Sequence, residues 1–494
     1  MDRRQFLSAA LIGLTPKTDR TVTGSFVNES QIAGHKLRDR VRFDAPRHDA
    51  KVPIVIVGGG IAGLSAAWRL YKRGFRDFIV LEMEPQAGGN ARSGSNDITA
   101  YPWAAHYLPI PNREAVYVRE LLEEFGVLQD GKFDERYLCF SPQERLYLHG
   151  RWQEGLEPEV AANKSDREQF ARFTERMREF RATKQFTIPM EVGARPSALD
   201  QLSMAAWLEQ QGFRSAYLRW YVDYACRDDY GAHSRDTSAW AGVHYFASRE
   251  HDEKGPLTWP EGNGWLLNKL LAKLGAYVRS SSLVYRIQRS GGKLEVFTPG
   301  TRYIADRVIY AAPTFTARYV VENPPDIHIE YSPWFTANVT LDRLPEQKGM
   351  EVAWDNVVFD SPSLGYVNAT HMSLRSHIDQ TVWTFYWALA DSTPVQSREW
   401  LLAHDWNFFK EAILNDLGRA HPDIRQCVSH IDVMRIGHAM ARPTPGAIFN
   451  PPRQRLAATN GPIYYANSDV SGFSIFEEAQ YRGVKAADSA LRRL

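Results

Sequence analysis

The stretch that decides the fold is PIVIVGGGIAGLSAAWRLYKRGFRDFIVLEMEPQAGGNAR, residues 53–92. It opens with a short β-branched run over 54–57, which has the composition of a buried strand. A glycine-rich turn over 58–63 follows at once, and residues 64–71 then carry apolar side chains at helical spacing. The order of elements is therefore strand, tight turn and helix.

The glycines of the turn have separate uses in a dinucleotide site. Gly58 permits the tight turn, Gly60 lets a pyrophosphate approach the backbone, and Gly63 lets the helix pack closely on the strand. The first helical N–H groups, at Ile61 and Ala62, have no partner within the helix and attract an anion. This segment is predicted to bind the pyrophosphate of a dinucleotide.

An acidic residue and a second glycine pair strengthen this prediction. Glu82 ends the next apolar run, at about the distance from Gly58 at which an acid reaches the ribose hydroxyls. Gly88, Gly89 and Asn90 follow, with Arg92 two residues further on. A second bare backbone segment with a cation can close over the other side of a pyrophosphate, which suits a large and permanently held cofactor.

At this point the chain resembles the flavin-containing amine oxidase superfamily, which includes monoamine and polyamine oxidases, protoporphyrinogen oxidases and phytoene desaturases. The resemblance implies FAD as cofactor. It also implies an α/β fold, in which a Rossmann-type FAD-binding domain carries an inserted substrate domain of mixed sheet and helices. On this basis we expect the FAD-binding domain over 51–110, 255–320 and 455–494, and the substrate domain over 111–254 and 321–454.

The resemblance continues at the C-terminal end. A strand over 463–467 leads to Asp469 and Gly472, and a helix follows. In the family the acid of this motif meets the ribityl–phosphate region and the helix faces the flavin. The resemblance also places a main-chain group near Val284 against the adenine. No cysteine stands in the segment 443–446 just before the motif, so we expect noncovalent FAD.

Two residues are candidates for the flavin N5 side. His106 lies in the element Ala104-Ala105-His106-Tyr107, which matches the family's segment along the isoalloxazine; the alternative is a structural, hydrogen-bonded histidine. Asn338 stands where amine-oxidising members commonly carry a lysine that holds a water. An amide can hold a water but supplies no cation, so Asn338 counts against amine oxidation with oxygen.

Between these motifs the chain is predicted to be helical and aromatic. Helices are expected over 112–125 and 165–182, the second opened by a capping box at Ser165 and Glu168. The stretch 217–249 is rich in aromatic and ionisable residues, including Asp228 and Asp229. Such a stretch suits the lining of a substrate pocket, and it suits a domain interface equally well.

The N-terminus resembles a twin-arginine export signal. Arg3, Arg4, Phe6 and Leu7 match its core, and the apolar run that ends at Leu14 is too short to span a bilayer. We therefore expect a signal over 1–14, the twin-arginine machinery as a partner, no transmembrane span, and a periplasmic location, with a cytoplasmic location as the alternative. Residues 15–50 are polar with little periodicity, and a tether is expected there.

Composition excludes several classes of protein. The 494 residues have a formal net charge of +1, so no bulk field attracts nucleic acid. The three cysteines are far apart and form no CxxC pair, which gives no support to a disulfide framework or a metal site. A small-molecule substrate and an electron acceptor, oxygen or a quinone, are the expected partners.

The predicted chemistry is hydride transfer from a substrate carbon to flavin N5. Three functions remain open from the sequence: oxidation of an amine or amino acid, desaturation of an apolar or polyene substrate, and electron transfer without a small substrate of its own.

Overall fold

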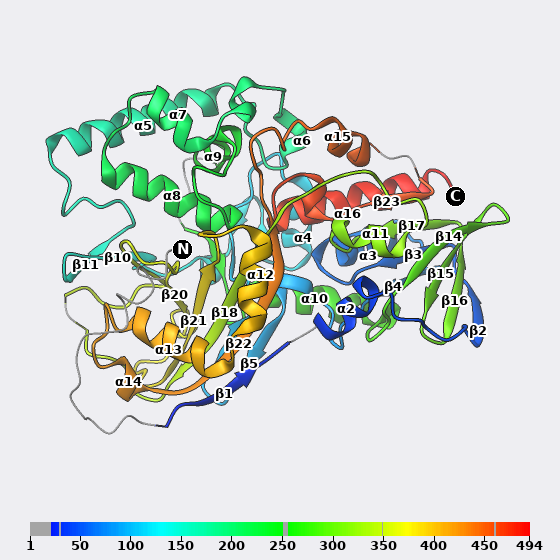
Figure 1. The fold of residues 1–494 in the computed structure, drawn as a ribbon, viewed down its shortest axis with the longest axis horizontal. Helices are drawn as coiled ribbons and strands as arrows, with labels where there is room; N and C mark the ends of the chain where they lie inside the picture. The colour runs from blue at the N-terminus through cyan, green and yellow to red at the C-terminus, as the bar shows by residue number, and fades with distance from the viewer. Residues whose placement is uncertain (1–20, 29–30, 250–254, 348, 459–460) are drawn as a thin grey trace.

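The computed structural model describes residues 21–28, 31–249, 255–347, 349–458 and 461–494. The predicted export signal lies outside these residues. Figure 1 shows two sheets side by side, with helices packed on each and a helical layer above the larger one. Within the described residues, no helix has both the length and the apolar character needed to cross a bilayer.

The smaller of these two sheets has five parallel strands drawn from separated parts of the chain. Two of its three inner strands, β3 and β4, consist only of apolar residues and are fully buried, as expected for a parallel sheet covered on both faces. The order is β13 (Val278–Arg279), β4 (Phe78–Leu81), β3 (Ile54–Val57), β17 (Arg307–Tyr310) and β23 (Ile463–Tyr465).

Each face of this sheet is covered by its own layer. One face packs against helices α3 (Ile61–Lys72), α4 (Val116–Glu124), α10 (Gly264–Leu274) and α16 (Phe476–Leu491) in a single apolar core. The other face packs against a four-stranded sheet of β14 (Arg286–Ser290), β15 (Lys293–Thr298), β16 (Thr301–Ala305) and β2 (His48–Lys51). This is the predicted Rossmann-type arrangement, so the expected fold class is confirmed.

The larger sheet is mixed and has eight strands. The pairs β1–β22 and β10–β19 are parallel, and the remaining pairs are antiparallel. The order is β1 (Thr23–Phe26), β22 (Val428–Ala441), β18 (Tyr331–Leu341), β21 (Thr381–Ala388), β20 (Tyr366–Asn368), β19 (Asp355–Val358), β10 (Glu144–Leu148) and β11 (Arg151–Glu154). Helices α12 (Pro394–Ala403), α13 (Trp406–Leu417) and α14 (Ile424–Cys427) complete the core beneath it.

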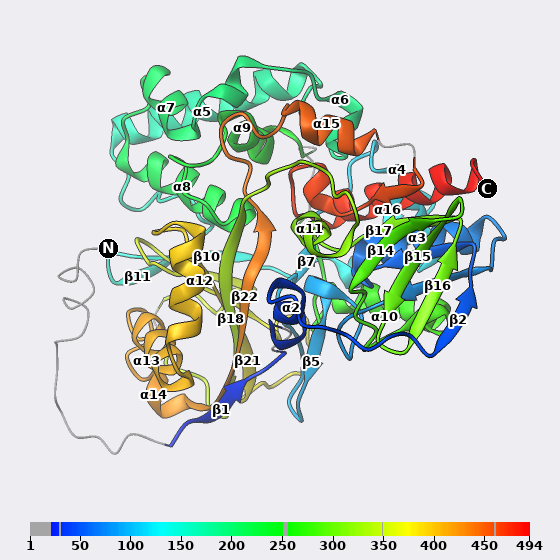
Figure 2. The same ribbon diagram turned by 45° about the vertical axis from the view of Figure 1, so that its right-hand side comes forward.

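A helical layer lies above the eight-stranded sheet, away from α12, α13 and α14 (Figures 1 and 2). It consists of α5 (Lys164–Ala182), α6 (Met190–Gly193), α7 (Met204–Gln210), α8 (Ala216–Tyr230) and α9 (Ala239–Ala247) around one aromatic core. The expected helix over 165–182 is present, but its capping box is formed by Asn163 and Asp166. The predicted box at Ser165 and Glu168 is wrong because the N-cap residue lies two positions earlier, at Asn163.

One histidine fixes the helical layer to the eight-stranded sheet. His233, just after α8, places Nδ1 2.8 Å from Asp223 Oδ2 and Nε2 2.9 Å from Asp391 Oδ1. Asp223 lies on α8, whereas Asp391 follows β21. Burial lowers the pKa of His233, but the two carboxylate hydrogen bonds outweigh burial and raise the pKa above its usual value. We call this contact the His233 clamp.

The N-terminal segment corrects a prediction. A tether was expected over 15–50, but β1 pairs with β22, residues Gln31–Arg38 form helix α2 against α11 (Ala317–Val320), and β2 pairs with β16. The polar sequence concealed these elements because an edge strand is held mainly by backbone hydrogen bonds. Strand β1 also makes an apolar contact, because the ring centroid of Phe26 lies 5.6 Å from that of Phe409.

Short elements complete the connections. They are β5 (Ser93–Ser95), β6 (Ala100–Pro102), β7 (Tyr107–Leu108), β8 (Leu128–Gln129), β9 (Lys132–Phe133), β12 (Leu257–Thr258) and α15 (Pro451–Ala457). Strand β7 pairs with β12, which positions the segment that carries His106. All three cysteines are buried and free.

Candidate active site

The glycine turn has the geometry that the sequence predicts. Gly58 has φ +101°, and a Cβ there would lie 2.8 Å from the backbone nitrogen of Ala312. A Cβ on Gly63 would lie 1.9 Å from the carbonyl oxygen of Gly58. No side chain larger than hydrogen fits at either position. Helix α3 begins at Ile61 without a side-chain cap, so the N–H groups around Ile61 and Ala62 remain available to an anion.

The second glycine pair lies directly against the turn. The N–H of Gly88 donates to the carbonyl oxygen of Gly59 at 2.9 Å, and Gly60 and Gly88 form a parallel bridge. A Cβ added to Gly60 would stand 3.9 Å from the Cα of Gly89. We call residues 58–63, Glu82 and residues 88–90 the dinucleotide cradle. Its walls are bare backbone, as a pyrophosphate site requires.

Glu82 closes one end of the cradle. Its Oε2 accepts from the N–H of Gly59 at 2.7 Å, and its Oε1 accepts from the N–H of Glu84 at 2.8 Å. Burial raises the pKa of this carboxyl, and the two backbone N–H groups oppose that effect. The N–H of Ser282 donates to the carbonyl oxygen of Glu82, which brings the segment of Val284 to the same strand end.

Asn90 joins the cradle to the segment of His106. The N–H of Ala105 donates to the carbonyl oxygen of Asn90, and the Asn90 amide donates to the carbonyl oxygen of Ala439 on β22 at 2.9 Å. Arg92 turns back, with its Nε donating to the carbonyl oxygen of Gly89 at 3.1 Å. The predicted cofactor residues 58–63, 82 and 88–92 are therefore brought together with His106.

The C-terminal motif meets the same region from the opposite side. Asp469 is 1% exposed and accepts hydrogen bonds from the N–H and hydroxyl of Thr314 and from the hydroxyl of Tyr331. Gly472 adopts φ +93°, and a Cβ on Gly483 of α16 would lie 2.1 Å from the carbonyl oxygen of Ala62. Helix α16 thus packs directly on α3. Through these hydrogen bonds Asp469 joins the segment after β17, which carries Thr314, to β18, which carries Tyr331.

His106 is neutral and has a defined tautomer. Its Nδ1 lies 3.0 Å from the carbonyl oxygen of Ala104, so this nitrogen must be the donor. Burial lowers the pKa of His106 to about 4, which leaves Nε2 as an acceptor at neutral pH. The ring lies against those of Tyr386, Trp354 and Tyr107, with centroids 5.1, 5.5 and 5.0 Å away. His106 also borders a cavity of about 10 Å³, room for about one water.

Asn338 is held by protein groups at both ends of its amide. Its Nδ2 donates to the carbonyl oxygen of Pro102 at 3.1 Å, and its Oδ1 accepts from the hydroxyl of Thr384 at 2.7 Å. The side chain is 2% exposed and ties β18 to β21 and β6. Each end keeps one further hydrogen-bonding position.

The structure adds a group of residues that the sequence did not join. Asp228 and Asp229 on α8, Asp355 on β19, and three tyrosines gather beside His106, and we call them the acid–aromatic cluster; the tyrosines are Tyr107, Tyr245 and Tyr386. The hydroxyl of Tyr386 donates to Asp355 Oδ1 at 2.7 Å. Asp228 and Asp229 were noted within the aromatic stretch, whereas no sequence pattern marks Asp355.

The carboxyls of this cluster have unusual proton affinities. Burial, with Asp229 and Glu144 nearby, raises the pKa of Asp228 to about 7. Burial raises the pKa of Asp229 to about 6, although Arg249 opposes it. Burial raises the pKa of Asp355 well above its usual value as well. Both Asp228 and Asp229 are half-buried rather than sealed, so a ligand can reach them. The cluster can bind a cation and take up a proton near neutral pH.

Comparison with known proteins agrees with this arrangement. The family model of flavin-containing amine oxidoreductases matches residues 61–491. Wild-type putrescine oxidase bound to putrescine has 17% identity and a TM-score of 0.68, covering 90% of this chain and all of its own. A putative protoporphyrinogen oxidase from Exiguobacterium sp. 255-15 has 16% identity and a TM-score of 0.64, over 90% of this chain and 99% of its own. At sequence identities this low, the similarity to these two structures shows a shared fold only.

A curated relative matches over a short stretch only. An L-amino acid oxidase of Cerastes cerastes is 39% identical over 84 residues, which are 17% of this chain and 15% of that protein.

Proposed function

The chain belongs to the flavin-containing amine oxidoreductase family, and from this premise we propose that it is an FAD-dependent oxidase of a small amine or amino acid. The FAD is held noncovalently. The observation that carries the proposal is the acid–aromatic cluster beside His106, because three carboxyls, two half-buried and one buried, with aromatic walls suit a cationic amine and penalise an apolar polyene.

The cradle supports FAD as the cofactor. Bare backbone at Gly58, Gly60 and Gly88 accommodates a pyrophosphate, and Glu82 stands at the strand end where an adenosine ribose would be bound. We assign the adenine contact to the backbone near Val284, and the isoalloxazine contact to the segment of His106. Noncovalent binding is supported by the cysteines, since none lies among the cradle residues and all three are buried.

A bound flavin would supply a two-electron acceptor for the hydride of the carbon that bears the amine. The substrate must first lose a proton from its ammonium group, because the nitrogen lone pair assists loss of the hydride. Asp228 is suited to accept that proton, since its pKa of about 7 makes its carboxylate an effective base near neutral pH. Asp229, whose pKa of about 6 leaves it mostly ionised at neutral pH, attracts the cation. Tyr107 and Tyr386 exclude water around it.

His106 and Asn338 orient the reacting region in this proposal. The neutral His106 ring offers Nε2 as an acceptor, and its place among three aromatic rings fixes its plane. Asn338 holds β6 against β18 and keeps one free donor and one free acceptor position. Oxygen or a quinone would be the electron acceptor for a bound flavin in this scheme.

The test is an anaerobic titration of the purified protein with amines, diamines and amino acids, followed by absorption. We expect an oxidised flavin spectrum that bleaches with at least one of these classes, and FAD released intact on denaturation. With oxygen readmitted, peroxide and an imine-derived carbonyl should form. A spectrum that stays oxidised with every amine, or a product with a new C=C bond, would contradict amine oxidation. Flavin that stays attached after denaturation would contradict noncovalent binding.

We further propose that the protein is exported by the twin-arginine pathway, on the match at Arg3, Arg4, Phe6 and Leu7. Replacement of both arginines by lysine should retain the protein in the cytoplasm, which fractionation would measure. Equal export of the variant would contradict this assignment.

A further inference from the structure

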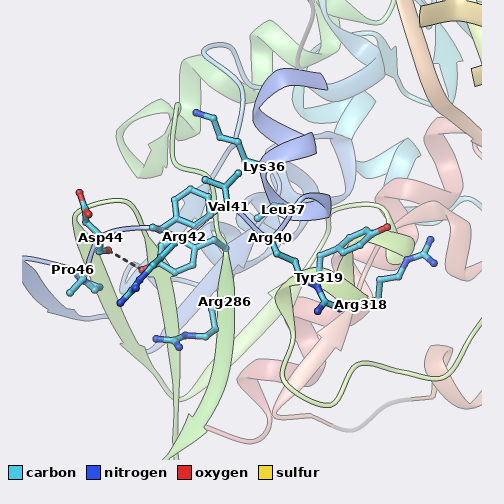
Figure 3. A pocket seen from close by; sticks show the side chains of 13 residues that line it. Lys36, Leu37, Arg40, Val41, Arg42, Asp44, Pro46, Arg286, Arg318 and Tyr319 are labelled. Carbon is cyan, nitrogen blue, oxygen red and sulfur yellow. Dashed lines mark hydrogen bonds between the residues drawn. The ribbon is translucent and has the colours of Figure 1, made fainter. Parts of the chain in front are cut away.

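A second cavity lies away from the active site. It has a volume of about 1070 Å³ and is bordered by α2, the segment after it, the start of β14 and helix α11 (Figure 3). No residue of the dinucleotide cradle lines it. Five basic side chains and one acid border it: Lys36, Arg40, Arg42, Arg286, Arg318 and Asp44. We call this cavity the basic groove.

The basic groove has a clear excess of positive charge, because five cations line it with one acid. Within the part of the chain that the structure describes, none of its five cations forms an ion pair with a carboxylate. The neighbouring Arg38, which does not line the groove, illustrates the contrast by pairing with Asp39 at 2.7 Å. Since the whole chain carries a formal charge of only +1, this concentration is local and leaves a strong positive field over one face.

Apolar side chains are exposed among these cations. Val41 and Tyr319 line the groove and are 47% and 37% exposed. Ile32, 67% exposed, lies one helical turn before Lys36 on α2, so the two side chains share a face of that helix. Large exposed aliphatic groups interleaved with Lys and Arg are the composition of a surface that enters the headgroup region of a membrane.

We propose that the basic groove and Ile32 form a face that docks on an anionic phospholipid surface. A free phosphate ligand would be held by convergent and desolvated donors, whereas Lys36, Arg40 and Arg42 are exposed and spread over the rim. A broad negative surface can satisfy such cations together, and the exposed Val41 and Ile32 gain by leaving water. This binding is peripheral and independent of the proposed amine oxidation.

The test uses the full-length protein with bound flavin and sedimentation with vesicles. Vesicles of phosphatidylcholine alone are compared with vesicles that also contain phosphatidylglycerol. The charge variant is Arg40→Glu with Arg42→Glu, and the apolar variant is Val41→Ser. Lys132→Glu with Arg151→Glu is the matched control, because both are exposed, neither lines the groove, and the change in net charge is the same. Flavin content and melting temperature verify that each variant is folded.

We expect binding to the anionic vesicles only, weakened about tenfold or more by the charge variant and about threefold by Val41→Ser. The control variant should bind within about twofold of the original protein. Equal binding to neutral vesicles, equal loss in the control, or no binding to anionic vesicles would overturn the proposal. Inorganic pyrophosphate serves as the soluble competitor. Saturable binding of pyrophosphate without vesicle binding would identify a small phosphate site instead.

Discussion

In the dinucleotide cradle the groups that face a ligand are backbone N–H groups, whereas in the acid–aromatic cluster they are carboxyls and rings. The cradle is assembled from residues 58–90, mostly within one strand–turn–helix unit. The cluster takes its members from β7, α8, α9, β19 and β21, which meet only when the helical layer closes over the eight-stranded sheet. A backbone site tolerates almost no change in side-chain size, while a side-chain site tolerates changes of shape but not of charge.

The largest effect is expected at Gly63. Gly63→Val should abolish flavin binding, because a Cβ there would lie 1.9 Å from the carbonyl oxygen of Gly58 and would force the turn open. Flavin absorbance per mole of purified protein measures the result. Gly275→Ala is the matched control, since a Cβ at Gly275 meets nothing within 4 Å. A Gly63→Val protein with full flavin content would contradict the claim that the cradle, unlike the cluster, tolerates no added side chain.

The second prediction separates chemistry from cofactor binding. Asp228→Asn should slow flavin reduction by the amine substrate about 10²- to 10³-fold, because the amide cannot accept the ammonium proton. Flavin content should not change, since Asp228 belongs to the cluster and not to the cradle. Stopped-flow absorption gives the rate, and Asp236→Asn, which lies outside the cluster, serves as control. Loss of flavin in the Asp228 variant would contradict the separation.

The pH dependence follows from the same carboxyl. At saturating substrate, the rate of flavin reduction should fall about tenfold per pH unit below about 7, because protonated Asp228 cannot act as a base. Above pH 7 the rate should level off. The Asp228→Asn variant should lack this inflection. A profile that is flat from pH 5 to pH 8 in the original protein, roughly the range over which Asp228 titrates, would exclude Asp228 as the base.

His106 and Asn338 should give an intermediate effect. His106→Gln or Asn338→Ala is expected to change flavin reduction about tenfold, since each positions the reacting region rather than exchanging the substrate proton. Flavin content should remain near that of the original protein. An unchanged reduction rate in both variants would assign these residues to structure alone.

The smallest effect is expected at the His233 clamp, on which the cluster depends for closure. His233→Gln should lower the free energy of unfolding by about 1 kcal/mol at pH 6. The folded pKa of His233 is raised, so its stabilising contribution is complete below the unfolded pKa of about 6.5 and is lost as pH rises through the folded pKa. Asp223 and Asp391 bond the ring and raise this pKa against the effect of burial, and Arg235 lowers it. Arg227 pairs with Asp223 behind the ring contact. Urea unfolding of the original protein and of His233→Gln at pH 6 and pH 9 measures this loss. The difference in free energy of unfolding between them should be smaller at pH 9, and a larger difference there would contradict the prediction.

The two sites also differ in how far the sequence predicts them. The cradle follows from the order of strand, turn and helix along the chain. Gly58, Gly63 and Glu82 take the predicted places because a turn of that length has few alternative conformations. Asp355 meets Tyr386 through the register of β19, β20 and β21, which no local pattern encodes. Asn338 was predicted on the correct strand, but its two protein partners, on β6 and β21, were not foreseeable.

The pairing of β1 with β22 has a consequence for the order of events during synthesis. Thr23–Phe26 are synthesised long before their partners, residues 430–433. Closing so long a loop is slow and requires β22 to be in place on β18 first. The edge of the eight-stranded sheet is therefore completed among the last steps of folding. Docking of the segment that follows the predicted export signal thus reports that the chain has been made and folded at least as far as β22.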